Sequence, residues 1–205
     1  MAQNFVDRLR AAQEKGLRVI EVIYDTPIWA REIASNGCGP IKPEFLADFA
    51  AFAREVARRA RLAGVRVDAW ELFNEPDVDR LSPLACYGDK GDAYYGGGDY
   101  AQMLMAVYPA LKTEDPSTKV LIGGLLLDCD PSNPPTGKDC TPSRFLEGIL
   151  RAGAAEFFDG VSFHAYDYYV SEGKYVNNNW WSGSTTTGPV VIAKARFLTD
   201  VLARY

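Results

Sequence analysis

The chain has 205 residues, 47% of them hydrophobic, and a formal net charge of −5. That length can bury the core of one domain, and the acidic balance gives no electrostatic reason to expect a nucleic acid or an anionic membrane as partner. No apolar run approaches the roughly 18 residues that span a bilayer, so a transmembrane helix is not expected.

The first part of the chain is predicted to form a helix, a strand and a second helix. Apolar residues at helical spacing predict a helix over 3–15, and Gly16 is a suitable end for it. An apolar run predicts a strand over 17–24. The second helix is expected over 43–63, with one apolar stripe facing the core. That stripe comprises Phe45, Leu46, Phe49, Phe52, Val56 and Ala60.

The rest of the chain continues the alternation of strands and helices. Residues 65–73 alternate apolar and polar side chains, which predicts a strand with one buried face. A helix with Asp99 as N-cap is expected to end near Thr113. The remaining elements are expected as a strand over 119–124, a helix over 141–151, a strand over 161–166 and a helix over 190–205.

Every predicted strand is separated from the next by a helix, which indicates parallel βαβ units in an open sheet or a barrel. The loops after the strands are longer than those after the helices, and function in such folds lies at the strand C-termini. The chain has neither a Gly-x-Gly-x-x-Gly turn after its first strand nor a Gly-Lys-Ser/Thr phosphate loop. The sequence therefore favours a (β/α)8 barrel over a nucleotide-binding sheet, and no cofactor is expected.

The four cysteines, Cys38, Cys86, Cys129 and Cys140, lie in predicted loops and allow three pairings. Cys129 and Cys140 could close one loop locally, and the other two would then join successive loops. Four reduced thiols remain an alternative, since disulfides need an oxidising compartment. A zinc site is less favoured because the cysteines are widely spaced and the chain has a single histidine.

Asn74-Glu75-Pro76 follows the second predicted strand. It places a carboxylate where a strand ends, with an amide directly before it and a rigid proline directly after it. This arrangement would fix a catalytic acid, although an ordinary solvated turn glutamate fits the same residues.

Three stretches at the ends of predicted strands resemble the retaining glycoside hydrolases of clan A. Trp70 to Pro76 is similar to the fourth strand of that clan, Thr26 to Ala30 to its third, and Phe158 to Tyr166 to its sixth. Within the clan, the resemblance is closest to family 39 and its relatives, such as β-xylosidases. It implies that residues 1–205 are one partial barrel domain, holding about strands three to six with their helices.

The resemblance implies that Glu75 is the general acid/base of a retaining O-glycosidase acting on a polysaccharide or oligosaccharide. Such an enzyme also needs a second carboxylate about 5–5.5 Å away as nucleophile. Carbohydrate is then the expected partner. Substrate-binding roles are implied for Asn74, His164, Tyr166, Trp29 and Trp180.

Each of these residues also has a purely structural interpretation. Asn74 could cap the turn, and His164 could be a core histidine with both nitrogens satisfied. Trp29 and Trp180 could simply pack their own loops.

The resemblance leaves one part of the chemistry unfilled. In the clan, the nucleophile is a glutamate at the end of the seventh strand, after a helix like the one predicted over 190–205. We therefore expect the nucleophile to be missing from this chain, because Glu71 lies below Glu75 on the same strand and Glu21 lies inside the first strand. The alternative is a non-catalytic carbohydrate-binding or interaction fragment. Self-association through exposed sheet edges is expected in either case.

Residues 1–5 lack the basic and apolar regions of a signal peptide. The chain is therefore expected to be cytoplasmic, or to have lost what precedes it. In the second case, an extracellular or periplasmic parent protein is favoured.

Overall fold

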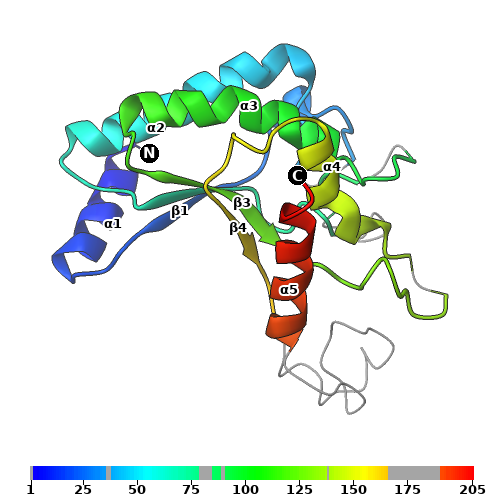
Figure 1. The fold of residues 1–205 in the computed structure, drawn as a ribbon. Coiled ribbons are helices and arrows are strands. Elements are labelled where there is room, and N and C mark those ends of the chain that lie inside the picture. Colours follow the sequence, from blue (N-terminus) through cyan, green and yellow to red (C-terminus); the bar gives the residue numbers. More distant parts are fainter. Residues whose placement is uncertain (1, 36–37, 79–84, 89–90, 138, 166–189) are drawn as a thin grey trace.

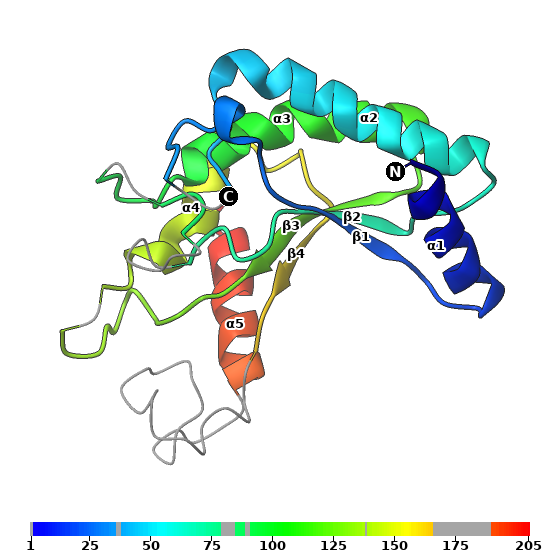
Figure 2. The same cartoon turned by 180° about the vertical axis from the view of Figure 1, so that it is seen from behind.

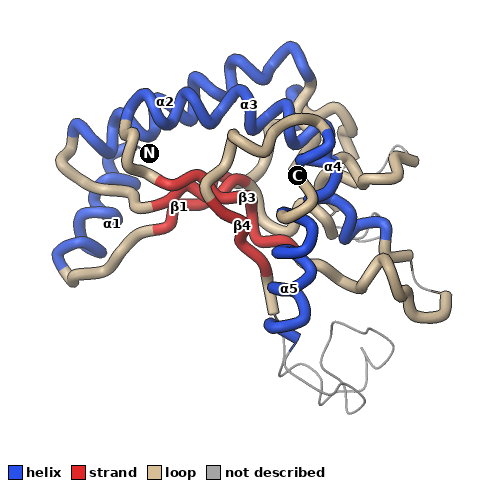
Figure 3. The backbone as a smooth tube through the Cα atoms, viewed as in Figure 1, coloured by secondary structure: helices blue, strands red, loops and turns tan. Residues whose placement is uncertain are grey.

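The computed structural model describes residues 2–35, 38–78, 85–88, 91–137, 139–165 and 190–205. In this part of the chain, four strands form one parallel sheet, in the order in which they occur along the chain. Sequential parallel strands joined by helices are the arrangement of a (β/α) barrel wall, without the reversal of strand order found in a doubly wound sheet. The strands, drawn red in Figure 3, are β1 (Ile20–Ile23), β2 (Ala69–Leu72), β3 (Lys119–Leu125) and β4 (Gly160–Phe163).

Helices precede, connect and follow these strands. Figures 1 and 2 show α2 and α3 side by side along one face of the sheet, with α1 beyond β1 and α5 beside β4. Among the described residues, three short 3-10 helices lie in the connections, at Ile28–Ala30, Pro43–Phe45 and Thr141–Arg144. The α-helices are α1 (Ala2–Glu14), α2 (Leu46–Leu62), α3 (Gly97–Glu114), α4 (Phe145–Arg151) and α5 (Val190–Leu202).

The core lies between the sheet and its helices. The strand register puts Trp70 beside Val120 and Leu72 beside Ile122 on one face, and none of these four side chains is more than 2% exposed. Val22 of β1, which points to the other face, is 43% exposed. At β1 the described helices therefore leave this second face open.

The predicted buried stripe of α2 is wrong in part. Phe52 is 54% exposed, and small residues face the core in its place. The ring of Phe52 instead lines a hollow at the end of β1, together with Tyr24. The buried residues of α2 are Ala50, Ala53, Ala57 and Ala60.

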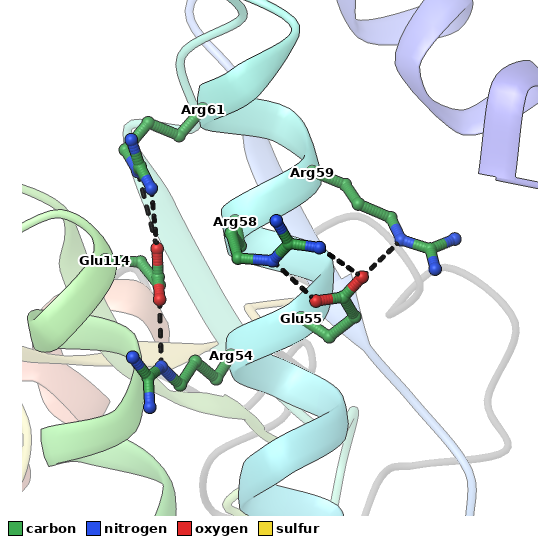
Figure 4. Close-up of polar contacts among 6 residues, drawn as sticks. All are labelled: Arg54, Glu55, Arg58, Arg59, Arg61 and Glu114. Carbon is green, nitrogen blue, oxygen red and sulfur yellow. Dashed lines mark hydrogen bonds and ion pairs between the residues drawn. The ribbon is translucent and has the colours of Figure 1, made fainter.

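An ion cluster joins α2 to α3 on the solvent side (Figure 4). Glu114 of α3 accepts hydrogen bonds from Arg54 at 2.8 Å and from Arg61 at 3.1 Å. A second carboxylate, Glu55, is held within α2 by two further arginines, whose hydrogen bonds lower its pKa to about 2. The arginine side chains are about half exposed, so these ion pairs contribute little to the stability of the fold.

Two element predictions need correction. The strand β2 was expected to bury one face, yet all four of its residues are buried, including Ala69 and Glu71 on the face opposite Trp70 and Leu72. Asp99 is not the N-cap of α3; Gly96 is, with a left-handed φ of 77°. Asp92 Oδ2 accepts the Gly96 N–H at 2.9 Å, so a different aspartate anchors this helix start.

The cysteines form two disulfides. Cys38–Cys86 joins the loop after β1 to the loop after β2, with the Cα atoms 4.9 Å apart. Cys129–Cys140 closes the loop after β3. This is the pairing in which one bridge is local and the other joins successive loops. Over the described residues, no helix combines the length and apolar character needed to cross a membrane.

Candidate functional site

Glu75 lies in a tight turn that follows β2. Phe73 and Glu75 both have left-handed φ angles, 64° and 47°, which non-glycine residues adopt rarely and at a cost. The Glu75 N–H donates to Gly124 O of β3 at 3.0 Å, and the Glu75 carbonyl accepts from Val78 N at 3.1 Å. The turn is thus bonded both to the neighbouring strand and to itself, which fixes the direction of the glutamate side chain.

The carboxylate of Glu75 faces the imidazole of His164, the first residue after β4. His164 Nδ1 and Glu75 Oε1 are 2.6 Å apart, and the two side chains are 30% and 18% exposed. The hydrogen bond with Glu75 raises the pKa of His164 against the opposing effect of burial, and the negative charges of Glu71 and Asp77 add to the rise. A short bond of this kind is typical of a charge-assisted pair.

Two glycines of β3 make room for this pair. The register between β3 and β4 shifts between Ile122 and Leu125, so the strand carries an irregularity at Gly123 and Gly124. A Cβ on Gly124 would lie 2.5 Å from His164 Nε2, and one on Gly123 would overlap the backbone after β2. Bulges of this kind re-aim side chains beside active sites. The Gly-Gly pair inside an apolar strand was the sequence signal, and it was missed.

A buried tyrosine of α3 bonds the backbone of β2 and β3 next to these glycines. Tyr100 of α3 is fully buried, and its hydroxyl donates to Leu72 O at 2.5 Å and accepts from Gly123 N at 3.0 Å. It therefore bridges the end of β2 and the irregular part of β3, where the normal ladder is interrupted.

Two further carboxylates lie close to the pair. Glu71, 8% exposed, accepts the Gly124 N–H at 3.3 Å. Asp77 is fully buried and accepts the N–H groups of Leu126 and Leu127 at 2.7 and 2.9 Å. Burial raises the pKa of Asp77 to about 6 despite these hydrogen bonds, and the charge of Glu75 adds to the rise. Sequence reasoning missed Asp77 because it read as the first residue of a long loop.

The structure does not bring all the predicted site residues together. Asn74 is exposed, directly before Glu75. Trp29 is 63% exposed, and its ring meets Phe45 edge-on with centroids 5.0 Å apart. Tyr166 and Trp180 lie outside the described residues.

Trp29 borders a hollow of about 480 Å³ at the end of β1. The described residues that line it come from that strand end and from the start of α2, and they include neither Glu75 nor His164. Several aromatic side chains line it, among them Tyr24, Phe49 and Phe52.

Another carboxylate at a strand end, Asp25, forms an ion pair with Arg31. It has a left-handed φ of 76°, and its Oδ1 lies 2.7 Å from Arg31 Nη2. Within the described ranges, no group of three or more His, Cys, Asp or Glu side chains could hold a metal ion. The arrangement is suited to proton transfer, since a carboxylate held by an imidazole can give up and take back a proton at one fixed place.

Comparison with known proteins gives structural matches only. No protein-family profile and no curated protein sequence matches the chain. A fungal β-1,4-galactanase structure matches with a TM-score of 0.58 and 19% identity, over 82% of this chain and 48% of that one. A conserved exported protein from Bacteroides fragilis matches with a TM-score of 0.60 and 17% identity, over 95% and 38%.

A family 39 glycoside hydrolase from Bacteroides cellulosilyticus also matches, with a TM-score of 0.54 and 22% identity, over 80% of this chain and 28% of that one. The chain thus spans less than half the length of each of these structures. At such identities the likeness shows the fold, and it confirms the prediction of part of a (β/α)8 barrel.

Proposed function

We propose that this chain is part of a retaining glycoside hydrolase of clan A, with Glu75 as its general acid/base. The observation that carries the proposal is the 2.6 Å contact between Glu75 and His164 at adjoining strand ends. Structural neighbours that are glycoside hydrolases support the enzyme class. Family 39 is the finer assignment that we propose, on the strand-end motifs around Trp29, Glu75 and His164.

In this proposal Glu75 protonates the oxygen of the leaving sugar and later removes a proton from the attacking water. His164 is proposed to orient the carboxylate, since its Nδ1 bonds Glu75 Oε1. Asn74, exposed beside Glu75, is proposed to bond a sugar hydroxyl. Tyr166, Trp29 and Trp180 are proposed as further contacts to a polysaccharide or oligosaccharide.

We propose that none of Asp25, Glu71 and Asp77 is the nucleophile. Asp25 pairs with Arg31, Asp77 is buried against the loop after β3, and Glu71 bonds the backbone of β3 below Glu75. The second carboxylate of the retaining reaction is therefore proposed to come from outside the described residues, as the resemblance implies.

The test is Glu75→Gln in a form of the protein that hydrolyses glycosides. General acid–base catalysis contributes about 10²–10⁴-fold, so hydrolysis of unactivated oligosaccharides should fall by that factor. An aryl glycoside with a good leaving group needs less acid assistance, and its cleavage should fall much less in the glycosylation step. Glu44→Gln, in the 3-10 helix before α2, is the matched control. Unchanged turnover of the unactivated substrate would refute the role of Glu75.

A second candidate function is a non-catalytic carbohydrate-binding or interaction fragment. It is favoured by the same observation on Asp25, Glu71 and Asp77, since each of these carboxylates is engaged in a contact of its own. Calorimetry with the 205-residue chain and oligosaccharides distinguishes the two. Binding without hydrolysis supports the fragment, and hydrolysis with retained anomeric configuration rules it out.

A further inference from the structure

A fully buried lysine lies beneath the Glu75–His164 pair. Lys194 belongs to α5, and its side chain has no exposed surface. Its ammonium group donates to Leu126 O at 2.7 Å and to His164 O at 2.9 Å. Leu126 and His164 are the first residues beyond β3 and β4, so one cation joins the two strand ends.

The position of this cation follows from the irregularity in β3. After the register shift, His164 N still donates to Leu125 O at 2.8 Å, but the strands end there. The next carbonyl groups lie beyond the ladder, and a buried carbonyl without a donor is costly. The Lys194 ammonium supplies donors to both, and hydrogen bonds from a charged donor are about twice as strong as neutral ones.

The same contact fixes the backbone from which the imidazole projects. Three hydrogen bonds hold His164. Its N–H donates to Leu125 O of β3, its carbonyl accepts from Lys194, and its Nδ1 bonds Glu75. Removing the middle contact would free the peptide after His164 to rotate. The imidazole would then lose its alignment with Glu75, although neither side chain had changed.

We propose that Lys194 is a positioning residue for the His164–Glu75 pair. Its effect on catalysis rests on the proposed function of Glu75, whereas its effect on the imidazole does not. Because His164 is the only histidine in the chain, its imidazole signals in NMR spectra need no further assignment. The hydrogen bond between Nδ1 and Glu75 can therefore be observed directly in the 205-residue chain without any substrate.

The test is Lys194→Met, which keeps an unbranched side chain one atom shorter than lysine and removes the donors. We expect the hydrogen-bonded Nδ1 proton signal of His164 to be lost or to move to the position of a free imidazole, as in Glu75→Gln. In a form that hydrolyses glycosides, kcat should fall about a hundredfold, with KM changed less than about threefold. A folded Lys194→Met protein with the wild-type imidazole signal would overturn the proposal, whether or not hydrolysis is found.

The matched control is Lys112→Met. Lys112 also bonds the backbone next to β3, donating to Thr118 O at 2.6 Å, but at the opposite end of the strand. Its removal should leave the His164 signal unchanged, and an equal change in both variants would overturn the proposal. If Lys194→Met does not fold, Lys194→Gln, whose shorter amide reaches one carbonyl only, should still shift the signal. An unshifted signal in that variant would also overturn it.

Discussion

Aspartate side chains accept backbone N–H groups at both ends of the sheet. At the N-terminal end, Asp68 accepts from Val19 N at 3.1 Å, and Asp159 accepts from Val120 N at 2.8 Å. At the C-terminal end, Asp77 accepts from two N–H groups of the loop after β3. The three carboxylates thus make the same kind of bond in different surroundings.

The surroundings differ in charge. Burial would raise the pKa of Asp159, but the hydrogen bonds of Lys112 and Val120 outweigh it and lower that pKa. The Val19 N–H, helped by Arg18, lowers the pKa of Asp68. Asp77 is buried beside another carboxylate, and its pKa rises to about 6. At the N-terminal end the acidic groups are paired with cations, whereas the C-terminal end keeps titratable groups close to neutral pH, as the proposed function would require.

This contrast gives the two ends opposite pH dependence. A lowered pKa contributes stability above the unfolded value, so the contributions of Asp68 and Asp159 are lost as the pH falls below about 4. A raised pKa contributes stability below the unfolded value, so that of Asp77 is lost as the pH rises through about 6. The raised pKa of His164 likewise contributes stability that is lost as the pH rises above about 6.5.

The largest effect is expected from Asp77→Asn. Ionisation of Asp77 in the folded state should cost about 3 kcal/mol of unfolding free energy between pH 4 and pH 7. The asparagine does not titrate, so the difference between the wild-type and variant stability curves should change by about that amount over this range. Urea unfolding at a series of pH values measures it. A constant difference would show that Asp77 is no more acidic or basic in the fold than in the unfolded chain.

A smaller effect is expected from Asp159→Ala at the other end of the sheet. It removes a charged acceptor from Val120 N and from Lys112, which should cost about 2 kcal/mol at pH 7 and less below pH 4. Lys119→Met, which removes the longer 3.6 Å ion pair, should cost no more than about 1 kcal/mol. The two ends of the sheet would not act independently if Asp159→Ala also displaced the NMR signal of the His164 imidazole.

The sequence predicts those features of the fold and of the site that depend on neighbouring residues. It does not predict those that depend on residues far apart in the chain. The alternation of strands and helices and the position of Glu75 after β2 are written in short local patterns. The approach of His164 to Glu75 could be expected only because parallel strands end at one edge. The roles of Asp77 and Lys194 could not be predicted in this way. Each side chain bonds backbone groups 30 to 68 residues away, and no local pattern reveals such contacts.

Packing between helices set a similar limit. The apolar stripe of α2 was read from its largest residues, yet its buried residues are alanines and Phe52 is half exposed. Likewise, Gly123 and Gly124 read as ordinary strand residues until the imidazole of His164 is placed against one of them. Sequence patterns thus give the elements, whereas the close contacts between elements decide which residue faces which.

The smallest effect on stability, and the sharpest on association, is expected at the edge of the sheet. Within the described residues β1 pairs with β2 alone, and Val22 on it is 43% exposed. We propose that this edge mediates self-association, because an unpaired apolar strand is a template for another chain. Val22→Lys should change stability by less than about 0.5 kcal/mol while reducing the association measured by sedimentation velocity. Leu62→Lys, an equal charge change at the end of α2, should leave association unchanged. A wild-type chain that stays monomeric at every concentration would exclude this role for the edge, and an equal fall in both variants would assign the effect to net charge.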